Sequence, residues 1–399
     1  DGDTTGGRTT AVGWGALGAQ NFTGGDITGN TAVGYSSLST NTTGINNTAI
    51  GYESLLANTT GADNVAIGYA ALGVNTTGAD NVAVGKQALD ANTTGANNTG
   101  LGDRTLSSNT TASNNTAVGK DALLVNTTGT DSVAVGSQAL DANTTGSYHT
   151  ALGRQALTAN TTGDNNIAIG YASLYTNTTG ASNVAVGNRA LLANTTASNN
   201  TAVGQDALYA NTTGTGNNAL GKASLDANTT GDYNVAIGDD ALGANTTADG
   251  NTAVGSAALT TNTTGANNTA VGLLALRLNT TGALNTAMGS GALQANTTGL
   301  ENVAMGYLAL TNNSTGTHNV AIGGSDGVSG ACLGTNTTGS QNTALGMQAL
   351  GTNNANNNTA VGHQSLKANT TGVENTAVGR ASADSITTGN YNTAIGSDA

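Results

Sequence analysis

Residues 64–80 read Asn-Val-Ala-Ile-Gly-Tyr-Ala-Ala-Leu-Gly-Val-Asn-Thr-Thr-Gly-Ala-Asp, and the same pattern of residue types returns 17 residues later. The glycine that closes the Ala-Val/Ile-Gly unit, called the marker glycine below, recurs at this interval without a slip from Gly34 to Gly323. This period is longer than a single strand and shorter than the repeats built from helix pairs. It predicts an all-β, parallel β-solenoid with one coil per repeat and about 23 coils once the irregular ends are included.

Composition supports a thin, repetitive structure. The 399 residues include 59 glycines and no proline, with 8% charged and 37% hydrophobic residues, which fits neither an ordinary globular core nor a disordered chain. Composition and register do not shift along residues 1–399, so we expect one continuous solenoid with one irregular insertion near 324–332. The net charge of −13 argues against nucleic acid as a partner, because phosphate binding needs a basic stripe.

Four positions of the repeat carry the predicted structural ladders, and each is numbered from its marker glycine. Alanine stands at −2 in all but one coil, an aliphatic residue, most often valine or isoleucine, at −1 and leucine at +4 in nearly every coil, and asparagine opens the turn Asn-Thr-Thr-Gly. In the first regular coils these residues are Ala32, Ala49, Ala66 and Ala83; Val33, Ile50, Ile67 and Val84; Leu38, Leu55, Leu72 and Leu89; Asn41, Asn58, Asn75 and Asn92.

The same positions predict two short strands and two bends in each coil. Asn-Thr/Val-Ala-Val/Ile is rich in β-branched residues, and the glycine after it suits a bend that needs a positive φ or a close backbone approach. Ala-Leu-x-Ala has a helix-friendly composition but is too short to nucleate a helix, so we interpret it as a second strand or an arc. Asn-Thr-Thr-Gly supplies the other bend, since asparagine bonds its own backbone.

Side-chain alternation extends this prediction to assembly. Neighbouring residues in a strand point to opposite faces, so the alanine at −2 and the aliphatic residue at −1 cannot both face one core. We expect the alanine to pack inside the coil and the aliphatic residue to face a second buried surface, of which another copy of the chain is the simplest. Two alternatives stay open: a bend that turns both positions inward, or a solvent face that tolerates valine.

The units Asn64–Gly68, Asn183–Gly187 and Asn234–Gly238 resemble the Asn-Ser-Val-Ala-Ile-Gly repeat of YadA-like heads in trimeric autotransporter adhesins. This resemblance covers the whole chain. It implies a left-handed parallel β-roll, three copies of which associate side by side on a bacterial surface. The expected function is that of a non-enzymatic, extracellular or cell-surface fibre segment, a homotrimer that meets a host or environmental surface. Similar arrays in phage tail fibres give the alternative of a tail-fibre shaft on a virion.

Two side-chain stripes offer a different class of function, that of a monomeric solenoid that binds a ligand. Tyr35, Tyr52 and Tyr69 follow three successive marker glycines, so they would stack about 4.8 Å apart and could bind a glycan. A solvated column that tolerates aromatic residues is the competing interpretation, because Lys86 and Asp103 follow at the same position. The threonine columns could instead bind ice.

No residue pattern predicts a cofactor or a metal. The histidines His149, His318 and His363 occupy three different positions of distant coils, which argues against a shared metal site. Aspartates recur in the turn, but the same position also accepts asparagine, serine and tyrosine, which disfavours calcium. The single cysteine, Cys332, is expected to be a small buried residue in the insertion rather than a reactive thiol.

The two ends of the chain lack the polar caps that solenoids carry. Asp1–Gly6 begins just before a turn, and Asn392–Ala399 stops after a first strand. This pattern favours either a segment of a longer array or copies that stack head to tail into a filament. No apolar run reaches membrane-spanning length, so we expect no membrane insertion within these residues.

Overall fold

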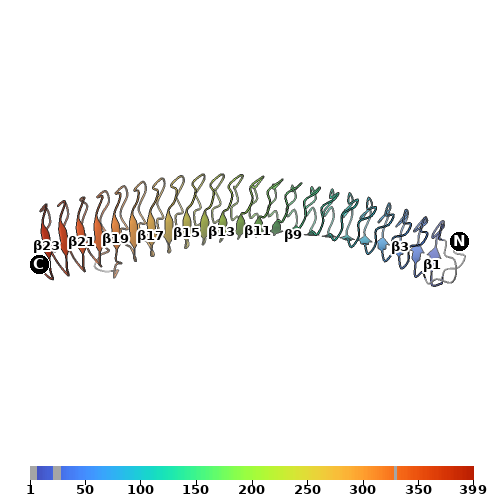
Figure 1. Cartoon of the computed structure of the whole chain (residues 1–399), viewed down its shortest axis with the longest axis horizontal. Coiled ribbons are helices and arrows are strands. Elements are labelled where there is room, and N and C mark those ends of the chain that lie inside the picture. Colours follow the sequence, from blue (N-terminus) through green and yellow to red (C-terminus); the bar gives the residue numbers. More distant parts are fainter. Residues whose placement is uncertain (1–6, 21–27, 328–329) are drawn as a thin grey trace. The chain divides into compact units, whose positions relative to one another are not determined.

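The computed structural model describes residues 7–20, 28–327 and 330–399, and it divides the chain into two compact units, residues 1–199 and residues 200–399. Within each unit every coil contributes one three-residue strand, and successive strands pair in parallel (Figure 1). Residues 17 apart lie side by side, as in Val65↔Val82 and Ala66↔Ala83. The predicted parallel β-solenoid with a 17-residue coil is therefore confirmed.

The strands of the first unit are β1 (Thr10–Val12), β2 (Thr31–Val33), β3 (Thr48–Ile50), β4 (Val65–Ile67), β5 (Val82–Val84), β6 (Thr99–Leu101), β7 (Thr116–Val118), β8 (Val133–Val135), β9 (Thr150–Leu152), β10 (Ile167–Ile169) and β11 (Val184–Val186). Those of the second unit are β12 (Thr201–Val203), β13 (Asn218–Leu220), β14 (Val235–Ile237), β15 (Thr252–Val254), β16 (Thr269–Val271), β17 (Thr286–Met288), β18 (Val303–Met305), β19 (Val320–Ile322), β20 (Thr343–Leu345), β21 (Thr359–Val361), β22 (Thr376–Val378) and β23 (Thr393–Ile395).

The marker glycine ends each strand for both of the reasons that the sequence suggests. Gly68 has a φ of 134°, which side-chain-bearing residues rarely adopt. A Cβ atom at Gly68 would lie 2.5 Å from the carbonyl oxygen of Gly85 in the next coil. The coils are thus so close at this bend that only glycine fits.

The segment after the marker glycine is an arc, and the predicted second strand per coil is wrong. The residues at +2 and +4 have positive φ, 52° at Glu53 and 51° at Leu55, whereas strands need a strongly negative φ. Such a conformation costs leucine about 1–3 kcal/mol. Complete burial of the leucine side chain returns about as much, and the Leu55 amide also donates to the Ala71 carbonyl oxygen of the next coil.

The core of each coil lies between the inner face of the strand and this arc. The alanines at −2, such as Ala66, and the leucines at +4, such as Leu72, are fully buried. Space for a side chain is limited there, since a Cβ at Gly100 would lie 2.9 Å from Oγ1 of Thr105 and 3.6 Å from the Leu89 side chain. The small strand residue and the large arc residue therefore fit each other.

The six-residue insertion displaces the chain without breaking the stack. Ser325 still donates its amide to the Tyr307 carbonyl oxygen at 2.8 Å, as the residue at +2 does in regular coils. The arc resumes at Cys332, whose carbonyl oxygen accepts from the Leu310 amide at 3.0 Å. Cys332 thus stands at +3, a position where Ala309 stands one coil earlier, and it belongs to the arc rather than to the insertion itself.

We predict that a methyl group is far more damaging at a marker glycine than elsewhere in the same coil. Gly238 has a φ of 131°, and its added Cβ would lie 2.6 Å from the Gly255 carbonyl carbon. Gly238→Ala should therefore lower the free energy of unfolding by at least about 1–3 kcal/mol, the cost of the strained backbone alone. Chemical denaturation of the variant measures this loss.

Gly243 provides the matched control in the same coil. It has no positive φ, and its added Cβ would meet nothing closer than 3.4 Å. Gly243→Ala should leave stability within about 0.5 kcal/mol of the parent, as surface substitutions usually do. Equal losses in the two variants would contradict the close approach at the marker glycine.

Candidate functional surfaces

The asparagines of the turn form a buried amide ladder. Asn41, Asn58, Asn75 and Asn92 are fully buried. The Asn58 side-chain amide donates to Oδ1 of Asn41 at 2.8 Å and to the carbonyl oxygen of Gly61 at 2.9 Å. These side chains stabilise the fold, and they present no surface to an external ligand.

A second amide ladder, formed by the asparagines at −4, was missed as a ladder by the sequence reasoning. The Asn64 backbone amide donates to Oδ1 of Asn47 at 3.0 Å, and the Asn47 side chain donates to the Gly61 carbonyl oxygen at 2.8 Å. Gly61 therefore accepts from both ladders. The signal was present in the sequence, since asparagine fills this position in 20 of 23 coils.

The aliphatic residues at −1 point away from the core. Val33, Ile67 and Val84 are half-buried, and Ile50 is 38% exposed. Leu220 in the second unit is 50% exposed. Their neighbours at −3, such as Thr48 and Val65, are also partly exposed, so the two positions form an outward strand face in each unit. The alternative in which the bend turns both positions inward is wrong.

The tyrosine stripe is a face-to-face stack that begins with Trp14. The centroids of Trp14 and Tyr35 lie 4.9 Å apart, those of Tyr35 and Tyr52 5.0 Å, and those of Tyr52 and Tyr69 5.4 Å. The interplanar angles are 14°, 9° and 7°. Because each ring covers its neighbour, the inside of the stack exposes ring edges and hydroxyl groups rather than ring faces.

The two threonines of each turn differ in what their hydroxyl groups do. The first is half-buried, and Thr59 Oγ1 donates to the Thr76 carbonyl oxygen of the next coil at 3.0 Å. The second, such as Thr60 or Thr77, is exposed. In the described part of the chain no hydrogen bond involves the hydroxyl of a second threonine, so this column faces solvent with its hydrogen-bonding capacity unused.

His149 interrupts the ladder at −4 and is almost completely buried. Its Nδ1 accepts from the Asn166 amide at 3.3 Å, and its Nε2 lies 3.3 Å from Nδ2 of Asn160. Burial lowers the pKa of His149 to about 4, although the nearby Asp164 carboxylate acts in the opposite direction. The imidazole is therefore neutral at pH 7 and replaces an asparagine amide.

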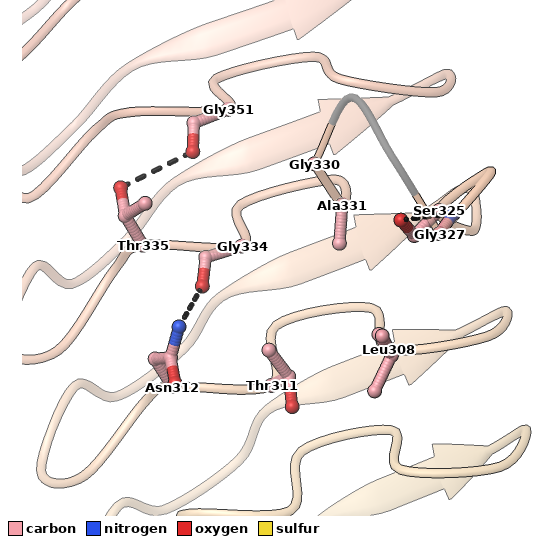
Figure 2. Close-up of a pocket in the computed structure, with 10 residues that line it drawn as sticks. All are labelled: Leu308, Thr311, Asn312, Ser325, Gly327, Gly330, Ala331, Gly334, Thr335 and Gly351. Atoms are coloured by element: carbon pink, nitrogen blue, oxygen red, sulfur yellow. Dashed lines mark hydrogen bonds between the residues drawn. The ribbon is translucent and has the colours of Figure 1, made fainter.

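The insertion covers a shallow hollow of about 320 Å³, lined mainly by backbone and small side chains (Figure 2). Two of its polar side chains are already engaged, since Nδ2 of Asn312 donates to the Gly334 carbonyl oxygen at 2.6 Å and Oγ1 of Thr335 to that of Gly351 at 3.1 Å. Cys332 is buried, and burial raises the pKa of its thiol to about 12. It is thus a small core residue rather than a nucleophile.

The turn aspartates bond to neighbouring coils. Oδ1 of Asp63 accepts from Asn46 at 3.0 Å, and Oδ1 of Asp131 accepts from Asn114 at the same distance. Among the described residues no three histidine, cysteine, aspartate or glutamate side chains gather closely enough to hold a metal ion. Over the same residues no helix is long and apolar enough to cross a membrane.

Comparison with known proteins adds no assignment. No family model matches the sequence, and no curated protein matches it either.

We predict that His149 makes the solenoid sensitive to acid. An unfolded chain has a histidine pKa near 6.5, so between pH 6.5 and 4 the unfolded state binds more protons than the folded state. The His149 contribution is fully present above pH 6.5 and is lost as the pH falls through 4, by about 3 kcal/mol in total. His149→Asn, which restores the common residue, should remove this dependence.

Comparing the wild-type protein with the His149→Asn variant separates the effect of His149 from that of other titrating groups. Burial raises the pKa of Asp141 to about 6, which makes the folded state more stable as the pH falls from 6 toward 4. Asp141 is present in both proteins, so the difference between their free energies of unfolding cancels its contribution. A difference that is constant from pH 7 to pH 4 would contradict the role of His149.

Proposed function

We propose that this chain is a structural segment of an extracellular fibre, in which copies associate side by side through their outward strand faces. The observation that carries the proposal is the column of aliphatic residues at −1, which continues from coil to coil in each unit and stays partly exposed. Long, continuous rows of apolar side chains on a solvent-exposed protein surface are typical of association sites. The resemblance to YadA-like heads favours three copies per assembly and a bacterial cell surface.

The repetition of the buried residues supports a structural role for the chain over a catalytic one. Almost every coil repeats nearly the same buried residues, so most of the variation lies on the outer surface. A repeat of this kind gives length and a regular outer surface, and a fibre needs both. Contact with a host or environmental surface would then fall to the variable outer positions.

The native mass of the purified chain tests this proposal. We expect three chains of 38.7 kDa each in light scattering. Replacing Ile50, Ile67 and Val84 by glutamate places three charges on the outward strand face, and it should yield single chains with unchanged circular dichroism. A wild-type mass of one chain at all concentrations would refute the proposed association.

A matched control places the same charges on another side of the same unit. Asn97, Asn165 and Asn199 stand at −5, where Glu301 and Glu374 occur naturally with a similar positive φ. Replacing these three asparagines by glutamate should leave the native mass at three chains. Dissociation of this control would show that charge alone, rather than the outward strand face, governs the mass.

One observation favours a second candidate function, the binding of ice. The second threonine of the turn is threonine in 17 successive coils, Thr43 to Thr315, although it is exposed and its hydroxyl is unused by the fold. Other exposed positions vary freely. Identical methyl and hydroxyl groups about 4.8 Å apart form a regular array, and a regular array suits the binding of a regular lattice such as ice.

Thermal hysteresis of a dilute solution tests this candidate. Ice binding predicts a gap between the melting and freezing temperatures, which should close when Thr60, Thr77 and Thr94 are replaced by glutamate. The absence of a gap in the wild-type protein would end this hypothesis.

A further inference from the structure

The residue directly after each marker glycine forms an exposed row that we call the axial column. It lies beyond the bend from the outward strand face, and all of its members in the first unit are exposed except the half-buried Asp103. In chain order the column is Trp14, Tyr35, Tyr52, Tyr69, Lys86, Asp103, Lys120, Ser137, Arg154, Tyr171 and Asn188.

Positive charge between residues 28 and 199 is confined to this column and the position beside it, and Arg8 is the one cation of the first unit that stands elsewhere. Between residues 28 and 199 all five lysines and arginines stand at +1 or +2, whereas six of the nine acidic residues stand elsewhere in the repeat. One of the five, Arg104, is paired with Asp121 at 2.7 Å. In a chain of net charge −13, this edge of the unit is therefore the place where an anionic partner meets the least repulsion.

The cations of the axial column are evenly spaced. Lys86, Lys120 and Arg154 follow one another at intervals of two coils, with Asp103 and Ser137 between them. Since neighbouring strands lie about 4.8 Å apart, the three charges recur about every 10 Å. A linear partner with one negative group at about this interval would meet all three.

The aromatic part of the column narrows the choice of partner. Single-stranded nucleic acids bind through successive bases stacked on free ring faces, whereas the faces inside the Trp14–Tyr69 stack cover one another. The ring edges and the row of tyrosine hydroxyls instead suit a polymer that is rich in hydroxyl groups. Arg154 lies 5.7 Å from the Tyr171 ring, which holds its guanidinium along the column.

We propose that the axial column of the first unit binds a linear acidic polysaccharide, in which acidic and neutral sugars alternate. The glycan lies along the stack with about one sugar ring per coil. Its carboxylates pair with Lys86, Lys120 and Arg154, and its hydroxyl groups bond to Ser137 and to the tyrosine hydroxyls. Each exposed ion pair is weak, so affinity comes from their number along one chain and grows with the length of the glycan.

The full chain can be tested with a defined oligosaccharide of alternating glucuronate and N-acetylglucosamine. Trp14 is the only tryptophan and belongs to the column, so its fluorescence reports binding directly. We expect saturable binding that weakens as salt is added. The triple variant Lys86→Gln, Lys120→Gln, Arg154→Gln should bind at least tenfold more weakly.

A second triple variant removes the same charge from other positions. Arg8, Arg277 and Lys367 lie outside the axial column, so replacing them by glutamine should change the affinity less than twofold. Equal losses in the two triple variants would overturn the proposal, as would the absence of binding to the wild-type chain. Equal affinity for uncharged N-acetylglucosamine oligomers, or tighter binding of oligo-dT, would also overturn it.

The proposal is independent of self-association. The native mass of each triple variant is measured separately. Loss of glycan binding at an unchanged mass then shows that the lost side chains of the axial column, rather than a change in self-association, cause the loss. A single-chain wild-type protein that still binds the oligosaccharide would refute the proposed fibre function and leave the glycan site intact.

Discussion

In the regular coils of each unit, a residue lies beside its own counterpart 17 residues later, and the rest of the structure depends on that constraint. A parallel ladder fixes the distance between coils at about 4.8 Å, so every side chain must be compatible with a near-copy of itself at that distance. Asparagine meets this condition inside the coil, because its amide donates to one neighbour and accepts from the other. An isolated buried charge could not, since its counterpart would repel it.

This constraint explains why the fold could be predicted so far from the sequence. The period, the marker glycine and the alanine at −2 each follow from local geometry that repeats, and a pattern seen in many coils cannot be accidental. The arc could not be predicted in the same way. Leu55 and Leu72 have a positive φ that leucine rarely adopts, and it is stabilised by the burial of their side chains and by the bonds of their amides to the next coil.

The surfaces were harder to derive than the core. Alternation correctly placed Ile50 on the outside, but the sequence alone left open a bend that turned it inward. The stacking of Trp14 on Tyr35 depends on ring orientation, which sequence spacing does not specify. The position of Cys332 could not be predicted either. The sequence shows that a coil is six residues too long, but only the backbone hydrogen bonds show where the extra residues lie. Here the bonds between Ser325 and Tyr307 and between Leu310 and Cys332 place the insertion before Cys332.

Because the coils are near-copies, comparing them with one another separates the positions at which the fold requires a particular residue from those at which it does not. At a buried position such as −2, more than twenty copies agree, and the close packing of Ala66 gives the reason. At +1, exposed copies range from tyrosine to lysine to aspartate, so the fold imposes no choice there. An ordered arrangement at such a position, a stack of four aromatic rings followed by cations at every second coil, is therefore not dictated by the core. Stacking stabilises the four rings locally, but it gives no reason for cations at every second coil. A partner outside the chain would give that reason, and this is why the axial column is a stronger guide to function than the far more regular core.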